Sequence, residues 1–263
     1  MRFDDAFANS KYLAGAKDFP PRWAAKAAGF REGMAENARL GLAYGPGERN
    51  WFDLYMPTGT PKGIVVFIHG GYWLAFGPRD FSHLAAGAIE AGWACATLSY
   101  TLAPQARIGT MTLETATALA AIADQTEGPM VVTGHSAGGH LSARMAQEDM
   151  ALAPMVLTRL KRVVPISPLS DLRPLLENSM NNDLGMNLSE ARAESPALHA
   201  RRANVSAHVW VGGAERPSFL DQARRLGNAW TCPVTVEPDL HHFNVIDGLE
   251  SAESSLMQTV LKI

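Results

Sequence analysis

Short apolar runs alternate with longer segments of helical periodicity along most of this chain. The run Ile64–Ile68 (IVVFI) is apolar at every position, which is typical of a strand buried on both faces of a sheet. Further short runs predict strands at Leu40–Tyr44, Trp51–Met56, Ala94–Leu98, Met130–Thr133, Val163–Ile166, His208–Val211 and Val234–Glu237. Helical patterns cover Phe81–Ala91, Met111–Thr126, Ala137–Gln147, Ser218–Trp230 and Val245–Leu261.

This alternation of strands and helices predicts βαβ units and therefore an α/β fold. We expect a mostly parallel, twisted sheet of about eight strands with helices on both faces. The first two strands flank the turn sequence GPGERN, so they should form an antiparallel hairpin at the edge of the sheet.

Two segments depart from the alternation. Residues 1–39 are polar with scattered aromatic residues, which predicts an N-terminal arm or helix laid over the rest of the fold. Residues 168–204 show neither a strand pattern nor a long helix, and a stretch of that length is usually functional. We interpret it as a small cap inserted at the carboxyl edge of the sheet. Since the chain has no internal repeat, we expect one domain over residues 1–263.

Composition narrows the classes of function. Lys and Arg number 23 against 26 Asp and Glu, and no basic cluster of the kind that binds nucleic acid is present. The N-terminus has acids where a signal peptide is basic, and no apolar run approaches the ~18 residues of a membrane span. The two cysteines fit a reducing compartment. We expect a cytoplasmic protein with a small-molecule partner, no nucleic acid and no membrane; a homodimer stays open.

A G-x-S-x-G motif, Gly134-His135-Ser136-Ala137-Gly138, follows the predicted strand Met130–Thr133 and opens a predicted helix. Strand, sharp turn and helix are the setting of a nucleophile elbow, in which glycines flank a strained serine. The alternative is a glycine-rich turn or a phosphate loop. Since no Lys follows the glycines, a Walker loop is disfavoured. The motif therefore predicts Ser136 as a nucleophile.

The sequence His69-Gly70-Gly71-Tyr72-Trp73 directly follows the strand Ile64–Ile68. Acyl transfer requires backbone N–H donors where the tetrahedral oxyanion forms. By the HGGG-type pattern these donors are the amides of Gly71 and Tyr72, together with the amide of Ala137 after the nucleophile. An ordinary βα turn is the alternative for this sequence taken alone. We expect His69 to hold the loop by hydrogen bonding.

The acid and the base should follow the serine in that order. Near the C-terminus His241 and His242 are adjacent, and we choose His242 as the base because it directly precedes Phe243. Glu215 follows the strand His208–Val211, where a catalytic carboxylate belongs. The rival acids are Asp171, which we expect to cap a helix, and Asp221, which lies within a helical pattern.

Together, HGGYW, SYTLAP (residues 99–104), GHSAGGH and the final HHF resemble α/β-hydrolases of the hormone-sensitive-lipase side. The likeness is greatest to bacterial kynurenine formamidase-like (arylformamidase-like) hydrolases and related esterases. It extends to ISPLSDLRPL and FANSKYL, and so covers nearly the whole chain. The resemblance implies the α/β-hydrolase fold. Pro168 and Glu215 differ from the family pattern, which usually has Gly and Asp there.

These residues predict a serine hydrolase that cleaves a small carboxylic ester or aryl formamide through an acyl-enzyme. We expect Tyr72, Trp73 and His135, with the cap and the arm, to line its substrate pocket. The remaining histidines show no metal-ligand spacing, so we predict neither a metal nor a cofactor. Two alternatives stay open: a ligand-binding protein on the same fold, and a thioesterase or peptidase with the same triad.

Overall fold

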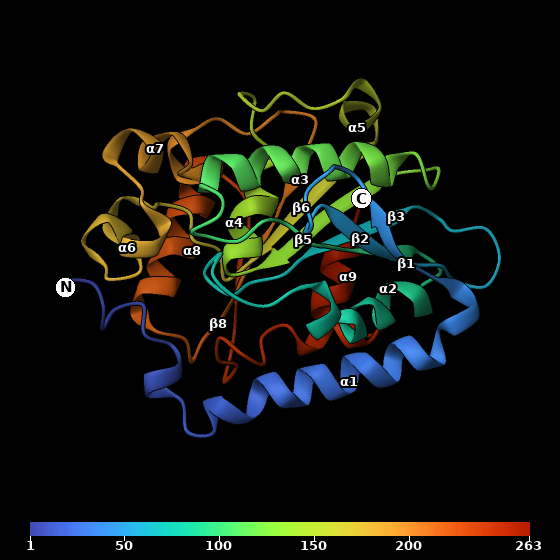
Figure 1. Ribbon diagram of the computed structural model, residues 1–263, viewed down its shortest axis with the longest axis horizontal. Helices are drawn as coiled ribbons and strands as arrows, with labels where there is room; N and C mark the ends of the chain where they lie inside the picture. The colour runs from blue at the N-terminus through green and yellow to red at the C-terminus, as the bar shows by residue number, and fades with distance from the viewer.

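The computed structural model describes all residues 1–263, and a nine-stranded sheet runs through its centre (Figure 1). The strand order is β1-β2-β4-β3-β5-β6-β8-β9, with the short strand β7 paired to β6. The strands are β1 (Ala38–Ala43), β2 (Trp51–Tyr55), β3 (Ile64–Ile68), β4 (Ala94–Leu98), β5 (Met130–His135), β6 (Leu160–Ile166), β7 (Ser206–Ala207), β8 (Val209–Gly212) and β9 (Val234–Glu237).

The strand β2 pairs antiparallel with both β1 and β4, whereas the pairs from β4 to β9 are parallel. The predicted α/β fold, with a hairpin at one edge, is therefore confirmed. Five-residue β3 is buried throughout, and its alternate side chains enter two separate cores. Ile64, Val66 and Ile68 face one core, while Val65 and Phe67 face the other, as expected for a strand covered on both sides.

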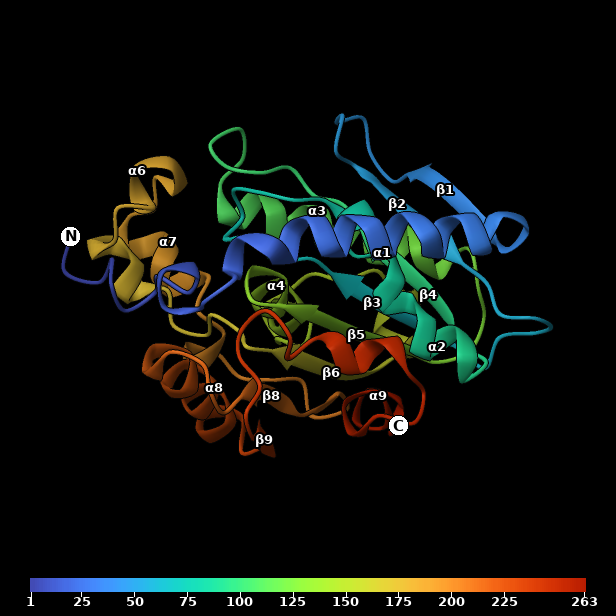
Figure 2. The same cartoon turned by 90° about the horizontal axis from the view of Figure 1, so that it is seen from below.

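Helices cover both faces of the sheet (Figures 1 and 2). One face is covered by α3 (Ile108–Ala123), α4 (Ala137–Arg144), α5 (Pro154–Arg159) and α8 (Pro217–Trp230). The other is covered by α1 (Phe19–Gly33), α2 (Ala86–Glu90) and α9 (Ser255–Leu261). Two small helices, α6 (Asn181–Leu184) and α7 (Leu188–Ala193), lie at one end, beside the N-terminus. None of the helices combines the length and apolarity needed to cross a membrane.

The 3₁₀ segments are short and lie mostly in the connections. They are η1 (Ser10–Tyr12), η2 (Ala16–Asp18), η3 (Ala35–Asn37), η4 (Pro78–Asp80), η5 (Ser82–Ala85), η6 (Arg173–Glu177), η7 (Pro196–Leu198) and η8 (Asp247–Glu250). The segment 168–204 holds η6, α6, α7 and η7, so it contains no strand and no long helix.

The expected helix Val245–Leu261 is wrong over its first half. A 3₁₀ segment ends at Glu250, and Ser251 then takes an extended conformation (φ −134°, ψ 136°). The final helix α9 begins only at Ser255, where the Ser254 side chain accepts a hydrogen bond from the Met257 amide. The first amides of a helix have no partner within the helix, and this N-cap supplies one, so it marks the start of a new helix.

Three of the five buried histidines lie in or beside the two cores. His69 and His140 are inaccessible to solvent, and His83 is 4% exposed. Burial lowers the pKa of His69 and of His140 to about 3, and that of His83 to about 4. Neither ring nitrogen of His83 has a hydrogen-bond partner. All three imidazoles are therefore neutral in the folded protein at neutral pH.

We expect the free energy of unfolding to fall on acidification, because the unfolded chain binds protons that the folded chain cannot. The pKa of His83 is about 4 in the folded protein, against about 6.5 when unfolded, so its contribution is lost as pH falls through this window. Replacing His83 with Met sacrifices no hydrogen bond and should reduce the loss between about pH 8 and pH 5 by about 2 kcal/mol.

Urea unfolding of the two proteins, followed at both pH values, measures this difference. The same loss of stability in His83→Met and in the parent protein would contradict the assignment.

Candidate active site

A cavity of about 740 Å³ opens at the end of the sheet where β3 and β5 finish, and it contains the side chain of Ser136. Its walls come from separated parts of the sequence. They include Phe7 of the N-terminal arm, Tyr72 of the loop after β3, Met180 of the segment 168–204, and His242. The cavity thus joins both segments that depart from the strand–helix alternation to the motifs that carry the chemistry.

Ser136 lies in the turn between β5 and α4, with φ 57° and ψ −114°. The flanking glycines are required by close backbone contact. A Cβ at Gly134 would lie 2.3 Å from the Gly138 carbonyl oxygen, and a Cβ at Gly138 would lie 2.0 Å from that of Ile68. β5 continues to His135, two residues beyond the predicted end of the strand. The serine therefore stands on a tight, left-handed turn, as the motif predicted.

The loop after β3 lies against this turn. A Cβ at Gly70 would come within 3.2 Å of the Ser136 Cβ atom. Gly71 and Tyr72 both have positive φ values, 110° and 53°. The amides of Gly71, Tyr72 and Ala137 donate no hydrogen bond to any protein group. Three free donors thus lie on the two segments that meet at the serine.

His69 stabilises this loop from within. Its Nδ1 atom lies 2.8 Å from the Gly70 carbonyl oxygen, and its ring stacks on that of Tyr100 at 4.4 Å between centroids. Because burial lowers the pKa of His69 to about 3, the ring is neutral and Nδ1 donates to the carbonyl. His69 therefore has the structural contacts that were expected of it.

His242 and Glu215 form a buried pair. Nδ1 of His242 donates to Oε2 of Glu215 over 2.7 Å. The other carboxylate oxygen, Oε1, accepts from the Gly212 amide over 2.9 Å and from the Ser167 hydroxyl. With Nδ1 occupied, Nε2 is the imidazole atom left to act on a substrate or a nucleophile. The His242 side chain is hydrogen-bonded to Glu215 and not to the Ser136 hydroxyl, a contact that is often long before substrate binds.

The neighbouring candidates have other contacts. The ring of His241 packs edge-on against Phe19 at 5.2 Å, and its Nδ1 atom accepts from the Phe243 amide. Asp171 is paired with Arg173 over 2.7 Å, and exposed Asp221 is paired with Arg225 over 2.6 Å. Glu215 and His242 are therefore the acid and the histidine that the fold brings together at the cavity.

Of the three expected pocket residues, Tyr72 and His135 line the cavity, but Trp73 does not. The Trp73 side chain is inaccessible to solvent, and its ring lies edge-on against His140 at 5.2 Å. The side chain belongs to the hydrophobic core on one face of the sheet, so the prediction for Trp73 is wrong. No group of three His, Cys, Asp or Glu side chains is arranged to hold a metal ion.

Sequence reasoning did not single out Ser167 or Asn9. Ser167 follows β6 directly, and its hydroxyl donates to Glu215. Its place at the carboxyl end of a strand beside β8 is the signal that could have identified it. Asn9 lies in the arm, and its side chain donates to the Tyr72 hydroxyl over 3.2 Å. No local pattern marks that contact, which joins residues 63 positions apart.

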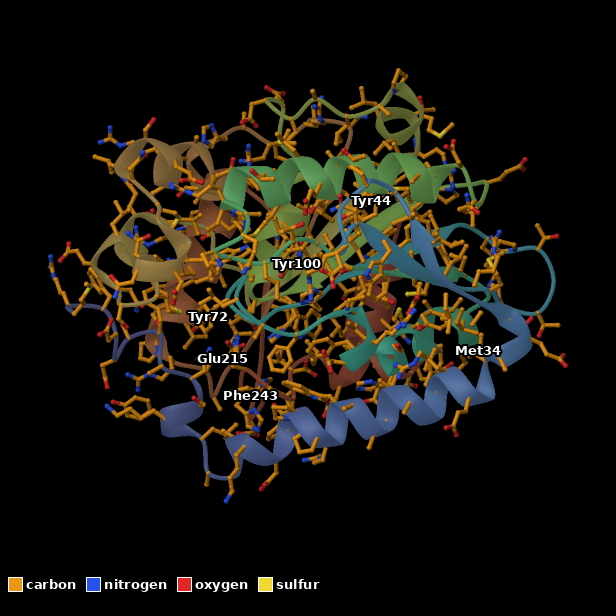
Figure 3. The ribbon with its side chains drawn as sticks, viewed as in Figure 1. Met34, Tyr44, Tyr72, Tyr100, Glu215 and Phe243 are labelled. Atoms are coloured by element: carbon orange, nitrogen blue, oxygen red, sulfur yellow. The ribbon has the colours of Figure 1, made fainter.

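Figure 3 labels three residues of this region, Tyr72, Glu215 and Phe243. They lie near one another where the N-terminal segment crosses the end of the sheet, and Tyr72 and Phe243 both line the cavity. Met34 and Tyr44 lie well away from them in the same view. The labelled site residues thus lie together, apart from Met34 and Tyr44.

Comparison with known proteins identifies relatives over most of the chain. The chain is 28% identical to kynurenine formamidase of Salmo salar over 246 residues, which cover 88% of this chain and 83% of that protein. It is 25% identical to kynurenine formamidase of Danio rerio, and the match covers 85% of this chain and 81% of that protein. The resemblance that the motifs predicted is therefore confirmed.

Solved structures show the same fold. A Silicibacter protein named as a candidate thioesterase is 51% identical, with a TM-score of 0.97 over 99% of both chains. Thermogutta terrifontis esterase 2 is 18% identical and shares the fold, with a TM-score of 0.66 over 86% of this chain and 91% of that one. A family profile described as the alpha/beta hydrolase fold matches residues 65–244, more than half of the chain. The chain therefore belongs to the α/β-hydrolase family, a family of hydrolytic enzymes.

Proposed function

We propose that this chain is a serine hydrolase that cleaves small carboxylic esters or aryl formamides through an acyl-enzyme. Ser136 is the nucleophile, His242 its base and Glu215 the orienting acid. The observation that carries the proposal is the position of Ser136, on a left-handed turn in the same cavity as His242, whose imidazole is hydrogen-bonded to Glu215. Free backbone donors on both adjoining segments support it.

The reaction begins when His242 Nε2 takes the proton of the Ser136 hydroxyl, and Oγ attacks the carbonyl carbon of the substrate. The tetrahedral oxyanion accepts hydrogen bonds from the amides of Gly71, Tyr72 and Ala137. As the intermediate collapses, His242 returns the proton to the departing alcohol or amine. Water, deprotonated by the same imidazole, then attacks the acyl-enzyme and releases the acid.

Glu215 holds the His242 imidazole in the tautomer that these reaction steps require. Its Oε2 accepts the Nδ1 proton, so Nε2 keeps its lone pair for the serine. When His242 becomes an imidazolium, the negative charge of the carboxylate stabilises it. The Gly212 amide and the Ser167 hydroxyl fix the other carboxylate oxygen, so that the pair has one orientation.

The cavity suits an apolar acyl or aryl group. Trp23, Phe76, Phe81 and Phe243 line one part of it, and their rings contact one another. The rings of Trp23 and Phe243 stack with centroids 5.8 Å apart. Aromatic walls bind planar apolar groups well, and the similarity to kynurenine formamidases adds aryl formamides to the candidate substrates.

A thioesterase is the second candidate, because the solved protein at 51% identity is named as a candidate thioesterase. The same triad would attack a thioester carbonyl and expel a thiolate, with no change in the roles assigned above. Turnover of N-formylkynurenine, short p-nitrophenyl esters and an acyl-thioester, compared at one enzyme concentration, separates the two. We expect ester or formamide to give the larger kcat/KM, and a large preference for the thioester would favour the second candidate.

Replacement of Ser136 with Ala should lower kcat for p-nitrophenyl acetate by about 10⁴-fold, because the acyl-enzyme no longer forms. The variant should also lose labelling by a fluorophosphonate probe. Ser10→Ala is the matched control, since exposed Ser10 lines the same cavity and makes no hydrogen bond through its side chain. Near-parental turnover or labelling in Ser136→Ala would reject the nucleophile, and would favour a protein that binds its ligand without cleaving it.

Replacement of Glu215 with Gln should lower kcat by about 10²- to 10⁴-fold, because an amide neither fixes the required tautomer nor stabilises the imidazolium. Asp221→Asn serves as control, since exposed Asp221 pairs only with Arg225. Steady-state kinetics of both variants decide the matter. If Glu215→Gln retained more than a third or so of parental kcat, the orienting acid would have to lie elsewhere.

A further inference from the structure

The backbone that carries the proposed oxyanion donors is held in an unfavourable conformation. Gly71, Tyr72 and Trp73 follow one another with φ values of 110°, 53° and 60°. Aromatic residues rarely adopt positive φ, so this stretch needs tertiary contacts to keep its shape. The Trp73 side chain supplies one anchor, because it is fully buried in the core.

The side chain of Tyr72 supplies a second anchor, and this one lies in the N-terminal arm. Its hydroxyl donates to the Phe7 carbonyl oxygen over 2.5 Å and accepts from the Asn9 side-chain amide over 3.2 Å. Phe7 is 4% exposed and Asn9 8%, so the arm residues in both contacts are buried. The Tyr72 hydroxyl therefore uses its proton and a lone pair on one short segment of the arm.

The same segment is held from the opposite side of the site. The Arg216 side chain donates to the carboxylate of Asp5 over 3.0 Å, and the Ser218 hydroxyl donates to the Ala6 carbonyl. The Phe7 ring lies edge-on against Phe219 at 5.9 Å. The Arg216 and Ser218 contacts come from residues directly after Glu215, so the arm is attached to the acid side as well as to Tyr72.

Phe219 extends this attachment to the base. Its ring lies 4.4 Å from that of His242, between centroids, and it is fully buried. Residues 5–9 of the arm thus lie between the loop that carries the oxyanion donors and the pair that activates the serine. We call residues 5–9 the strap.

We propose that Tyr72 is a positioning residue: its hydroxyl, bound to the strap at Phe7 and Asn9, fixes the direction of the Gly71 and Tyr72 amides relative to Ser136. The role rests on the proposed serine-hydrolase function. Donors aimed at an oxyanion act on the transition state and much less on the bound ester. Loss of the hydroxyl should therefore lower kcat and leave KM nearly unchanged.

Replacement of Tyr72 with Phe tests this, because the ring and its packing remain while the hydroxyl is lost. We expect kcat for p-nitrophenyl acetate to fall about 10- to 100-fold, KM to change less than about twofold, and fluorophosphonate labelling to slow in parallel with kcat. Active-site titration corrects for inactive protein, and the melting temperature reports stability separately.

Tyr44→Phe is a closely matched control. The Tyr44 hydroxyl also donates to a backbone carbonyl, that of Ser99, over 2.8 Å, and accepts from an asparagine, Asn50, over 3.4 Å. It lies away from the site (Figure 3). A purely structural effect of losing such a hydroxyl would lower the melting temperature in both variants and leave kcat per titrated site unchanged in both.

Asn9→Ala provides a second, independent variant. We expect a several-fold fall in kcat, and no further fall when it is combined with Tyr72→Phe, since both act through one hydroxyl. Parental kcat in Tyr72→Phe, fully additive effects, or a change confined to KM would overturn the positioning role. If the parent protein shows no turnover that depends on Ser136, both the serine mechanism and the positioning role are rejected. If the parent shows such turnover and Tyr72→Phe has the same kcat, only the positioning role is rejected.

Discussion

The closest backbone contact of the site lies between the serine turn and the end of β3, and the remaining geometry depends on it. Gly138 approaches the Ile68 carbonyl so closely that no side chain fits, and Gly134 approaches Gly138 in the same way. These contacts let α4 begin directly at the edge of the sheet. The nucleophile is thereby set against the loop that follows β3, at a distance that only glycine permits.

That contact also explains why residues of distant sequence position can cooperate. In a parallel sheet the carboxyl ends of neighbouring strands lie at one edge, and β3, β5, β6 and β8 are successive neighbours here. The loops after these strands carry the donors, the nucleophile, Ser167 and Glu215, respectively. The order of strands in the sheet thus places four functional groups in a row. His242 follows β9, the neighbour of β8 at the edge of the sheet.

Much of the fold could be predicted because burial on both faces leaves a strong pattern. The bounds of β3, β4 and β9 agree with the predicted runs, since each is a compact apolar or alternating segment between turn residues. The final helix was overextended because its helical periodicity continues through Ser251, where the backbone is extended. Helix α5 has six residues, and so short a helix offers too few turns for a periodic signal.

The residues of the site also divide into those that the sequence predicts and those that it does not. Ser136, Gly71, Glu215 and His242 lie in local motifs at strand ends, where one sequence suffices to identify candidates. The contacts of Asn9 with Tyr72, and of Phe7 with Phe219, join residues far apart in the chain and have no local signature. Trp73 was misplaced because its side chain packs in the core beside His140, a contact between distant residues that has no local signature.

Several residues around the cavity have a strained backbone, and contacts with the rest of the fold hold each of them in place. Tyr72, Trp73, Ser136 and Ser167 all have positive φ, at a cost of roughly 1–3 kcal/mol for each such residue. Such a conformation persists only where surrounding contacts determine it. A fully buried indole on one side of the Tyr72–Trp73 peptide, and a hydroxyl bound to the strap on the other, constrain that peptide from both directions. Ser136 is constrained by glycine packing instead, and Ser167 by its hydrogen bond to Glu215. These contacts restrain Tyr72 and Ser136, which carry groups that the proposed reaction uses, and Ser167, which holds Glu215.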